Sequence, residues 1–220
     1  MSSTQPPYRT LFSHTIYSAQ LREERTIKIF NPVVSLENLP LPILYCQDGI
    51  EFFMFGRVAT IVKGLIDNRQ LPPILIAGVA SSRRYRNEEY MPGTARNADY
   101  IEFFRYEAME FVEYEYRHVL APDQKPIRHL AGVSLGATIA MQLALRFPEA
   151  FQKLLLFSGA FYRRLAPDLR QHASLPSLST YLLVGDEETA VETPLGIGNF
   201  VEDNLWLREM LQNKKNAIPI

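Results

Sequence analysis

The sequence predicts a single α/β domain, residues 1–220, with a mostly parallel central β-sheet and helices on both of its faces. Continuous apolar runs occur at 43–46, 74–79, 154–157 and 181–184. Such runs are typical of strands that are covered on both faces. Helical patterns separate them, and this alternation predicts right-handed β-α-β units. A chain of 220 residues is long enough to bury one substantial core.

The N-terminal part of the chain departs from this pattern. Residues 14–20 and 26–30 alternate apolar and polar side chains, as half-buried antiparallel strands do, and Asn31-Pro32 ends the second segment. We therefore expect an antiparallel pair of strands at the N-terminal edge of the sheet. Residues 1–12 are expected to form a flexible N-terminus.

Boundary signals place the principal helices. Capping-box-like pairs at 99 with 102, and at 199 with 202, predict two helix starts. Residues 135–146 are apolar nearly all round and are followed closely by Pro148, which predicts a buried helix. Residues 127–131 read as a short strand in front of that helix, and 217–220 as the start of a further strand.

Composition and charge limit the binding partners and the cellular compartment that we expect. The formal net charge of -1 gives no reason to expect a nucleic-acid or anionic-membrane partner. The single cysteine, Cys46, excludes an internal disulfide framework and suits a reducing compartment. No apolar run approaches the length of a membrane span, and the polar start lacks the features of a signal peptide. We expect a cytoplasmic protein, with a homodimer left open.

One motif carries catalytic chemistry. Gly-Val-Ser-Leu-Gly at 132–136 lies between the predicted strand 127–131 and the predicted helix 135–146. This is the strand–turn–helix setting of a nucleophile elbow, in which a strained turn exposes the serine hydroxyl. The motif predicts Ser134 as the nucleophile of an acyl transfer. The alternative is an ordinary turn whose serine caps a helix.

An attack by Ser134 on a carbonyl places negative charge on oxygen, which requires nearby N–H donors. One donor is expected to be the backbone N–H of Leu135, at the helix N-terminus. The second should follow the strand 43–46, where we expect the amide of Gly49 or Ile50. The alternative interpretation of Asp48-Gly49 is an ordinary turn.

A carboxylate and then a histidine should follow the serine in chain order. Three carboxylates, Asp186, Glu187 and Glu188, follow the strand 181–184 and so lie at the carboxyl edge of the sheet. The four histidines, none of which lies beyond these acids, are His14, His118, His129 and His172. His172 lies in a long loop after Ser134. It is a weak candidate for the base, because in the usual chain order the histidine follows the acid.

The sequence gives weaker clues to the substrate. Arg84 and Arg86 follow the strand 74–79, so they could clamp an anionic substrate at the carboxyl edge. The alternative, which we favour, is that Arg86 pairs with Glu89 and the others are solvated. The aromatic cluster at 52–55 could wall an acyl pocket, although such a cluster is more often helix core. We expect no metal and no organic cofactor.

Several segments resemble one known family. They are similar to its opening strand pair (18–21 and 26–32), its "LYLLDG" strand and loop (43–49), its R-x-x-E-Y segment (86–90), its "ELLPxVE" helix (107–113) and its elbow (131–137). The chain thereby resembles the putative-esterase family of α/β-hydrolases, which includes enterochelin-esterase-like enzymes, S-formylglutathione hydrolases and feruloyl esterases. The resemblance covers nearly the whole chain.

The resemblance implies an α/β-hydrolase fold and a serine carboxylic-ester hydrolase that acts through an acyl-serine intermediate on a small or siderophore-like ester. Its G-x-x-D or G-x-x-E pattern implies Glu188 as the acid, with Asp186 as the alternative. Relatives carry a Gly-Gly-His-like loop after one further strand, whereas this sequence ends at Ile220, inside the expected strand. The catalytic histidine is therefore expected to be absent from residues 1–220.

Three alternatives stay open at this stage. A catalytically silent hydrolase fold could bind a ligand or a protein partner. A truncated product with an unfilled sheet edge could associate with another chain. An acyltransferase would use the same residues with a different acceptor, and it is less favoured.

Overall fold

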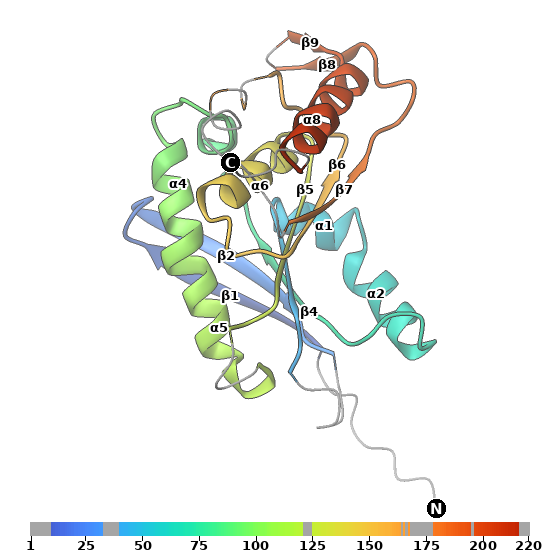
Figure 1. Ribbon diagram of the computed structural model, residues 1–220. Helices are drawn as coiled ribbons and strands as arrows, with labels where there is room; N and C mark the ends of the chain where they lie inside the picture. The colour runs from blue at the N-terminus through green and yellow to red at the C-terminus, as the bar shows by residue number, and fades with distance from the viewer. Residues whose placement is uncertain are drawn as a thin grey trace, which may run out of the picture.

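The computed structural model describes residues 10–32, 40–120, 125–163, 165, 167, 178–194 and 196–215. Within these ranges the chain forms one twisted seven-stranded sheet with helices on both faces (Figure 1). None of the helices in this part of the chain is long and apolar enough to cross a membrane.

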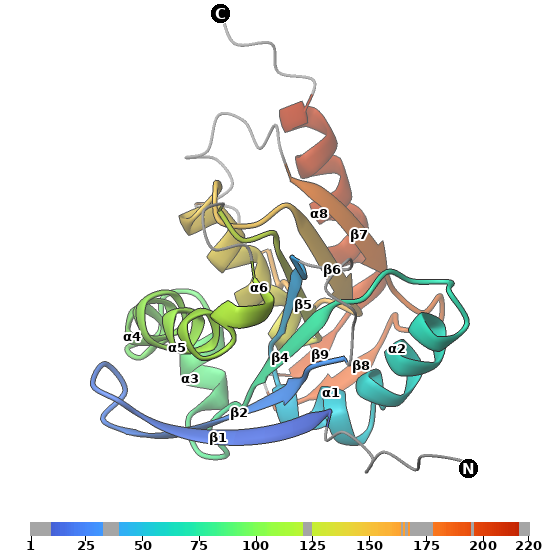
Figure 2. The ribbon, with the colours of Figure 1, turned by 90° about the horizontal axis from the view of Figure 1, so that it is seen from below.

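The sheet has the order β1-β2-β4-β3-β5-β6-β7. Its strands are β1 (Leu11–Ser18), β2 (Glu23–Phe30), β3 (Ile43–Cys46), β4 (Leu75–Val79), β5 (Arg128–Val133), β6 (Lys153–Phe157) and β7 (Ser179–Leu183). β2 pairs antiparallel with both β1 and β4, and the remaining pairs are parallel. Figure 2 shows the β1–β2 hairpin at one edge of the sheet. The expected mostly parallel sheet with an antiparallel N-terminal edge is confirmed.

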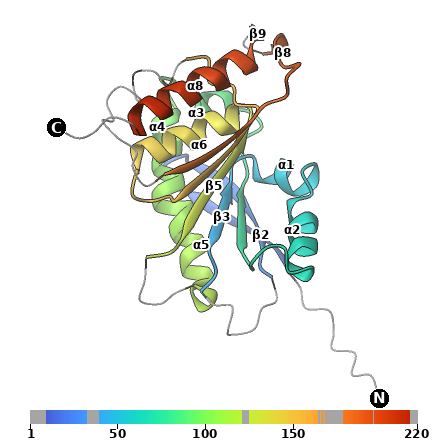
Figure 3. The same ribbon diagram turned by 45° about the vertical axis from the view of Figure 1, so that its right-hand side comes forward.

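Helices cover the two faces unequally. α1 (Gly49–Met54) and α2 (Val58–Asp67) cover one face, with Ala59 and Val62 in a small core cluster. The other face carries the larger core and α3 (Arg86–Tyr90), α4 (Asn97–Phe103), α5 (Met109–Glu115), α6 (Leu135–Arg146) and α8 (Phe200–Lys215). Figure 3 shows α1 and α2 on one side of the sheet, with α6 and α8 on the other.

The central strands are the best buried. Every residue of β4, from Leu75 to Val79, is buried, as the continuous apolar run predicts. β7 differs, because it pairs with β6 alone among the described strands of the sheet, and its Tyr181 and Leu183 are 56% and 51% exposed. The centre of the sheet is therefore buried, whereas its edge at β7 is partly exposed and pairs with no further strand among the described residues.

Two of the three principal helices begin where the sequence predicts. α6 spans Leu135–Arg146 and is buried almost throughout. At the start of α8, the Asn199 side-chain oxygen accepts a hydrogen bond from the Glu202 N–H at 3.0 Å, so this predicted cap is confirmed. The cap predicted at residue 99 is wrong, since α4 begins at Asn97 and its capping residue makes no side-chain hydrogen bond.

Several elements were not predicted. A π-helical turn, Phe104–Ala108, joins α4 to α5, and a 3-10 turn, Arg117–Val119, follows α5. β8 (Val191–Thr193) and β9 (Gly196–Gly198) form a separate antiparallel hairpin. β1 begins at Leu11, so residues 11–12 of the expected flexible N-terminus belong to a strand. The strand expected at 217–220 lies outside the described residues.

Candidate active site

Ser134 occupies the sharp turn between β5 and α6. Its backbone has φ 55° and ψ -125°, a conformation that costs a non-glycine residue about 1–3 kcal/mol. Its N–H donates to the Phe157 carbonyl oxygen at 2.9 Å, and its carbonyl oxygen accepts from the Ala160 N–H at 3.1 Å. A side chain at Gly132 would put its Cβ 2.0 Å from the Gly136 carbonyl oxygen. The turn is therefore tight, strained and held by the neighbouring strand β6.

A cavity of about 380 Å³ opens beside Ser134. Its lining residues, which come from the segment after β3, from α3 and from the end of β5, are Asp48, Glu51, Phe52, Phe55, Gly56, Arg86, Val133 and Ser134. Val133 is 41% exposed and Phe55 is 80% exposed. The volume suits a small molecule, and the walls offer it mainly apolar and aromatic contacts.

The starts of α1 and α6 meet at this cavity. The first N–H groups of a helix have no partner within the helix, and those of Ile50 and Leu135 have none elsewhere among the described residues. A Cβ on Gly136 would lie 2.7 Å from Asp48 Oδ2, and one on Gly49 would lie 2.0 Å from the Gly78 carbonyl carbon. Asp48 and the start of α1, which carries Gly49 and Ile50, are thus packed tightly between β4 and α6.

Asp48 is held in a left-handed conformation, φ 52°, by α3. Arg86 Nε and Nη2 donate to its Oδ1 and Oδ2, each at 2.7 Å, and its backbone N–H donates to the Tyr90 hydroxyl oxygen at 3.2 Å. Burial opposes the charge on Arg86, but the hydrogen bonds and charge of Asp48 outweigh burial and raise the pKa of Arg86. The favoured pairing of Arg86 with Glu89 is wrong, because Arg86 pairs with Asp48.

Arg84 lies outside this arrangement. Its guanidinium carbon stands 4.9 Å from the centre of the Tyr85 ring, the side chain is exposed, and it does not line the cavity. Of the two arginines proposed as an anion clamp, Arg86 lines the cavity with its guanidinium bound to Asp48, and Arg84 is directed to a neighbouring ring.

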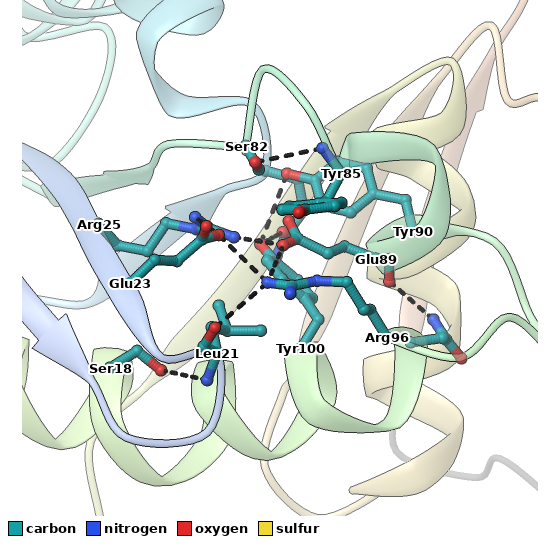
Figure 4. A network of polar contacts seen from close by, with 12 residues as sticks. Ser18, Leu21, Glu23, Arg25, Ser82, Tyr85, Glu89, Tyr90, Arg96 and Tyr100 are labelled. Atoms are coloured by element: carbon teal, nitrogen blue, oxygen red, sulfur yellow. Dashed lines mark hydrogen bonds and ion pairs between the residues drawn. The ribbon is translucent and has the colours of Figure 1, made fainter.

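A buried ion network anchors α3 to the sheet (Figure 4). Glu89, which is fully buried, accepts hydrogen bonds from Arg25 of β2 and, at 3.3 Å, from Arg96. Arg25 also pairs with Glu23. Burial raises the pKa of Glu89, and the two guanidiniums offset part of that rise. Sequence reasoning missed this network, because its central pair, Arg25 and Glu89, is separated by 64 positions along the chain.

Two buried tyrosine hydroxyl groups extend the contacts of Asp48 into the protein interior. The Tyr100 hydroxyl donates to the Gln47 side-chain oxygen at 2.5 Å and lies 3.5 Å from the Tyr90 hydroxyl oxygen. Burial is the main reason that the pKa values of Tyr90 and Tyr100 are raised, so both stay protonated. The loop that ends β3 is therefore tied to α3 and α4 on its inner side.

Glu188 lies on the other side of β6. Its Oε1 accepts hydrogen bonds from Ser158 Oγ at 2.7 Å and from the Gly185 N–H at 2.9 Å. Ser158 directly follows Phe157, the residue whose carbonyl oxygen binds the Ser134 N–H. Asp186 is exposed, and none of the described hydrogen bonds involves its carboxylate. Of the two acids considered, Glu188 is the one bound to the strand next to Ser134.

The three described histidines lie away from Ser134. His14 is on β1, where its Nε2 lies 2.8 Å from the Tyr116 hydroxyl, and His118 follows α5 and stacks on the same ring. His129 is on β5, five residues before Ser134, and at about 3.3 Å per residue the two are roughly 16 Å apart. His172 lies outside the described residues.

Comparisons with known proteins agree with this architecture. The protein YjcH of Bacillus subtilis (strain 168) is 28% identical over 211 residues, which are 95% of this chain and 87% of that protein. Enterochelin esterase from Shigella flexneri is similar in structure, with a TM-score of 0.76 and 21% identity over 97% of this chain and 53% of that chain. The BES protein from Bacillus cereus gives a TM-score of 0.69 and 18% identity over 97% and 87%.

An IroE-like serine hydrolase from Shewanella oneidensis is also similar, with a TM-score of 0.72 and 20% identity over 93% of this chain and 69% of that chain. The chain spans about half the length of the Shigella esterase chains that it matches. At these identities the likeness shows the fold, which is that of the α/β-hydrolases. Residues 18–217 match the model of the Esterase family, described as putative esterase, and the chain belongs to this family of enzymes.

Proposed function

We propose that this protein is a serine hydrolase of carboxylic esters, with Ser134 as the nucleophile in a nucleophile elbow. The strained conformation of Ser134 beside the cavity is the observation that carries the proposal. Strain of this kind persists at sites where it serves function. The acyl or alcohol part of a small ester could bind in this largely apolar cavity, next to the Ser134 hydroxyl.

In the proposed reaction, Ser134 Oγ attacks the ester carbonyl carbon while its proton passes to a base. The carbonyl oxygen becomes an oxyanion and accepts hydrogen bonds from the N–H of Leu135 and from that of Gly49 or Ile50. The C–O bond to the alcohol then breaks, and the alcohol leaves with the proton from the base. A water molecule then gives a proton to the base and attacks the acyl carbonyl carbon. The C–O bond to Ser134 breaks, Oγ recovers the proton from the base, and the carboxylic acid leaves.

The proposed acid is Glu188. One of its oxygens is bound by Ser158 and Gly185, and none of the described hydrogen bonds involves Oε2, which can therefore accept from an imidazole N–H. The imidazole itself is expected either from residues that the gene encodes after Ile220 or from His172, and in each case it lies outside the described residues.

A second candidate function is a hydrolase fold that binds a ligand without converting it. One observation favours it: within the described ranges, no histidine lies near Ser134. A ligand-binding protein could keep the cavity and the anchored loop without a base.

Hydrolysis of p-nitrophenyl acetate and butyrate tests the proposal. Two forms should be assayed: the 220-residue chain, and a form extended by any residues that the gene encodes after Ile220. We expect hydrolysis by a form that contains the base, and a loss of about 10³-fold or more in kcat/KM on Ser134→Ala. Ser179→Ala, which changes an exposed serine at the start of β7, is the matched control. Hydrolysis that survives Ser134→Ala would exclude the mechanism, and inactivity of every form would favour the ligand-binding function.

The same assay identifies the base. Activity in the 220-residue chain that is lost on His172→Ala would assign this role to His172. Activity that appears only in the extended form would assign it to a residue beyond Ile220. A thiol or alcohol acceptor that raises the rate of p-nitrophenol release would indicate acyl transfer in place of hydrolysis.

A further inference from the structure

The charged side chains around the cavity carry a second inference, which concerns the kind of ester that fits. Asp48, Glu51 and Arg86 are the charged residues that line it. Asp48 and Arg86 form a bidentate pair, with both N···O distances at 2.7 Å, so their charges offset each other. Arg86 is therefore not free to bind an anionic group of the substrate, because that would require it to leave Asp48.

Glu51 is the one charged lining residue that does not belong to this ion pair. It lies in the first turn of α1, its side chain is exposed, and none of the described ion pairs or side-chain hydrogen bonds includes it. Its negative charge helps to raise the pKa of Arg86, as expected of a nearby carboxylate. The helix N-terminus favours an acid at this position but does not neutralise its charge.

Three arginines in the segments next to the lining residues Gly56 and Arg86 do not line the cavity, so they do not balance Glu51 there. Arg57, which follows the lining residue Gly56, is exposed and is not among the lining residues. Arg83 and Arg84 are exposed in the segment after β4, and neither lines the cavity. Glu188, on the other side of β6, adds a further negative charge to the region near Ser134.

Three of the remaining lining side chains are apolar. Phe52, Phe55 and Val133 offer contacts to an alkyl or aryl group but no hydrogen-bond donor to a carboxylate. An anionic group placed against these three side chains would gain no hydrogen bond from them, and it would also be repelled by Glu51.

We infer that Glu51 makes this cavity selective for neutral or cationic esters over anionic ones. This inference rests on the proposed function, since it concerns the ester that Ser134 attacks. It also narrows the substrate class, because siderophore-like esters that carry catecholate or carboxylate charge beside the reacting carbonyl are expected to fit poorly. Small apolar esters are expected to fit well.

Binding of intact esters to the Ser134→Ala variant tests selectivity without requiring catalysis. The probes are 4-carboxyphenyl butyrate, which is anionic and whose carboxylate cannot reach its own ester carbonyl, and p-nitrophenyl butyrate, its neutral counterpart of the same shape. Dissociation constants can be measured by ligand-observed NMR at low salt. We expect the neutral ester to bind about tenfold more tightly than the anionic one, because Glu51 would repel a carboxylate held in the cavity and low salt screens this repulsion little. A trimethylammonium analogue is expected to bind at least as tightly as the neutral ester.

The preference should depend on Glu51 itself. Glu51→Gln in the Ser134→Ala background should reduce the ratio to about threefold or less, and Glu51→Lys should favour the anionic ester. Glu110→Gln is the matched control, because it removes one exposed carboxylate on α5, away from the cavity.

Three results would overturn the inference. They are equal or tighter binding of the anionic ester, a ratio that responds to Glu110→Gln as much as to Glu51→Gln, and the absence of binding by either ester. None of them bears on whether Ser134 is a nucleophile. The hydrolysis assay with Ser134→Ala decides that question separately, so failure of the inference and failure of the proposed function can be told apart.

Discussion

The two sides of the candidate active site are held in different ways. On the side of β3 and α3, Asp48 is fixed by a bidentate pair with Arg86 and by Tyr90, and a buried ion network lies behind them. On the side of β6 and β7, the Glu188 carboxylate accepts two hydrogen bonds, from Ser158 and Gly185, next to the outermost described strand of the sheet. The first side lies in the core of the domain, whereas the second lies at the edge of the sheet.

This difference suggests a division of roles. Residues on the anchored side support folding as well as the position of the proposed oxyanion donors, so changes there should lower stability. Residues on the margin make few buried contacts, so changes there should affect activity while leaving the fold nearly intact. The predictions below test this division, from the largest expected effect to the smallest.

The largest effect is expected at Glu188, and it should fall on activity. In the form that hydrolyses p-nitrophenyl butyrate, Glu188→Gln should lower kcat by about 10²–10⁴-fold, because the amide cannot stabilise a charged imidazole. The urea midpoint of unfolding should hardly change. Asp186→Asn is the control and should retain nearly full activity. Equal losses from both substitutions would make the identification of Glu188 as the acid untenable.

Glu89→Ala should cause the largest loss of stability on the anchored side. It leaves Arg25, which is 4% exposed, with Glu23 as its remaining carboxylate partner. Loss of one member of a buried ion pair costs about 3–5 kcal/mol, measured as the free energy of unfolding in urea. Glu88→Ala, at the exposed neighbouring position, should change it by less than about 0.5 kcal/mol. A small effect at Glu89 would mean that α3 is not anchored by this network.

Gly49→Ala should destabilise the protein by about 1–3 kcal/mol through overpacking, because the added Cβ would lie 2.0 Å from the Gly78 carbonyl carbon. Gly64→Ala in α2 is the matched control. A Cβ there meets no atom within 4 Å, and alanine is the better helix former, so this variant should gain up to about 1 kcal/mol. Thermal unfolding of the two variants measures the contrast, and similar Tm values would refute it.

The smallest effect concerns pH. Burial raises the pKa of Glu89 in the folded protein, so the folded state binds the proton more tightly than the unfolded state. The stabilisation due to the protonated group is therefore fully present below the ordinary glutamate pKa and is lost as pH rises through the raised value. Relative to Glu89→Gln, the wild-type protein should gain about 1 kcal/mol or less between pH 7 and pH 5. A difference that moves in the opposite direction would show that the two arginines outweigh burial.

The sequence predicted the parts of this molecule that depend on local patterns. The buried strand β4, the helix α6 and the turn at Ser134 follow from apolar periodicity, small residues and motif spacing. The pairing of Asp48 with Arg86, and of Glu89 with Arg25, could not be predicted, because these contacts form only when distant segments pack together. The start of α4 was misplaced because Asp99 resembles a cap, although the helix already begins at Asn97.

The placement of the anchor on α3 has a consequence for protein engineering. Asp48 is fixed by Arg86 and Tyr90, which lie outside the segment from Phe52 to the end of α2 that supplies the aromatic wall of the cavity. That segment begins after Gly49 and Ile50, so it could be exchanged for one of different length without removing the ties on Asp48 or the proposed oxyanion donors. Grafting alternative segments from Phe52 to the end of α2 onto this chain would then change which esters fit while preserving Ser134 and the start of α1.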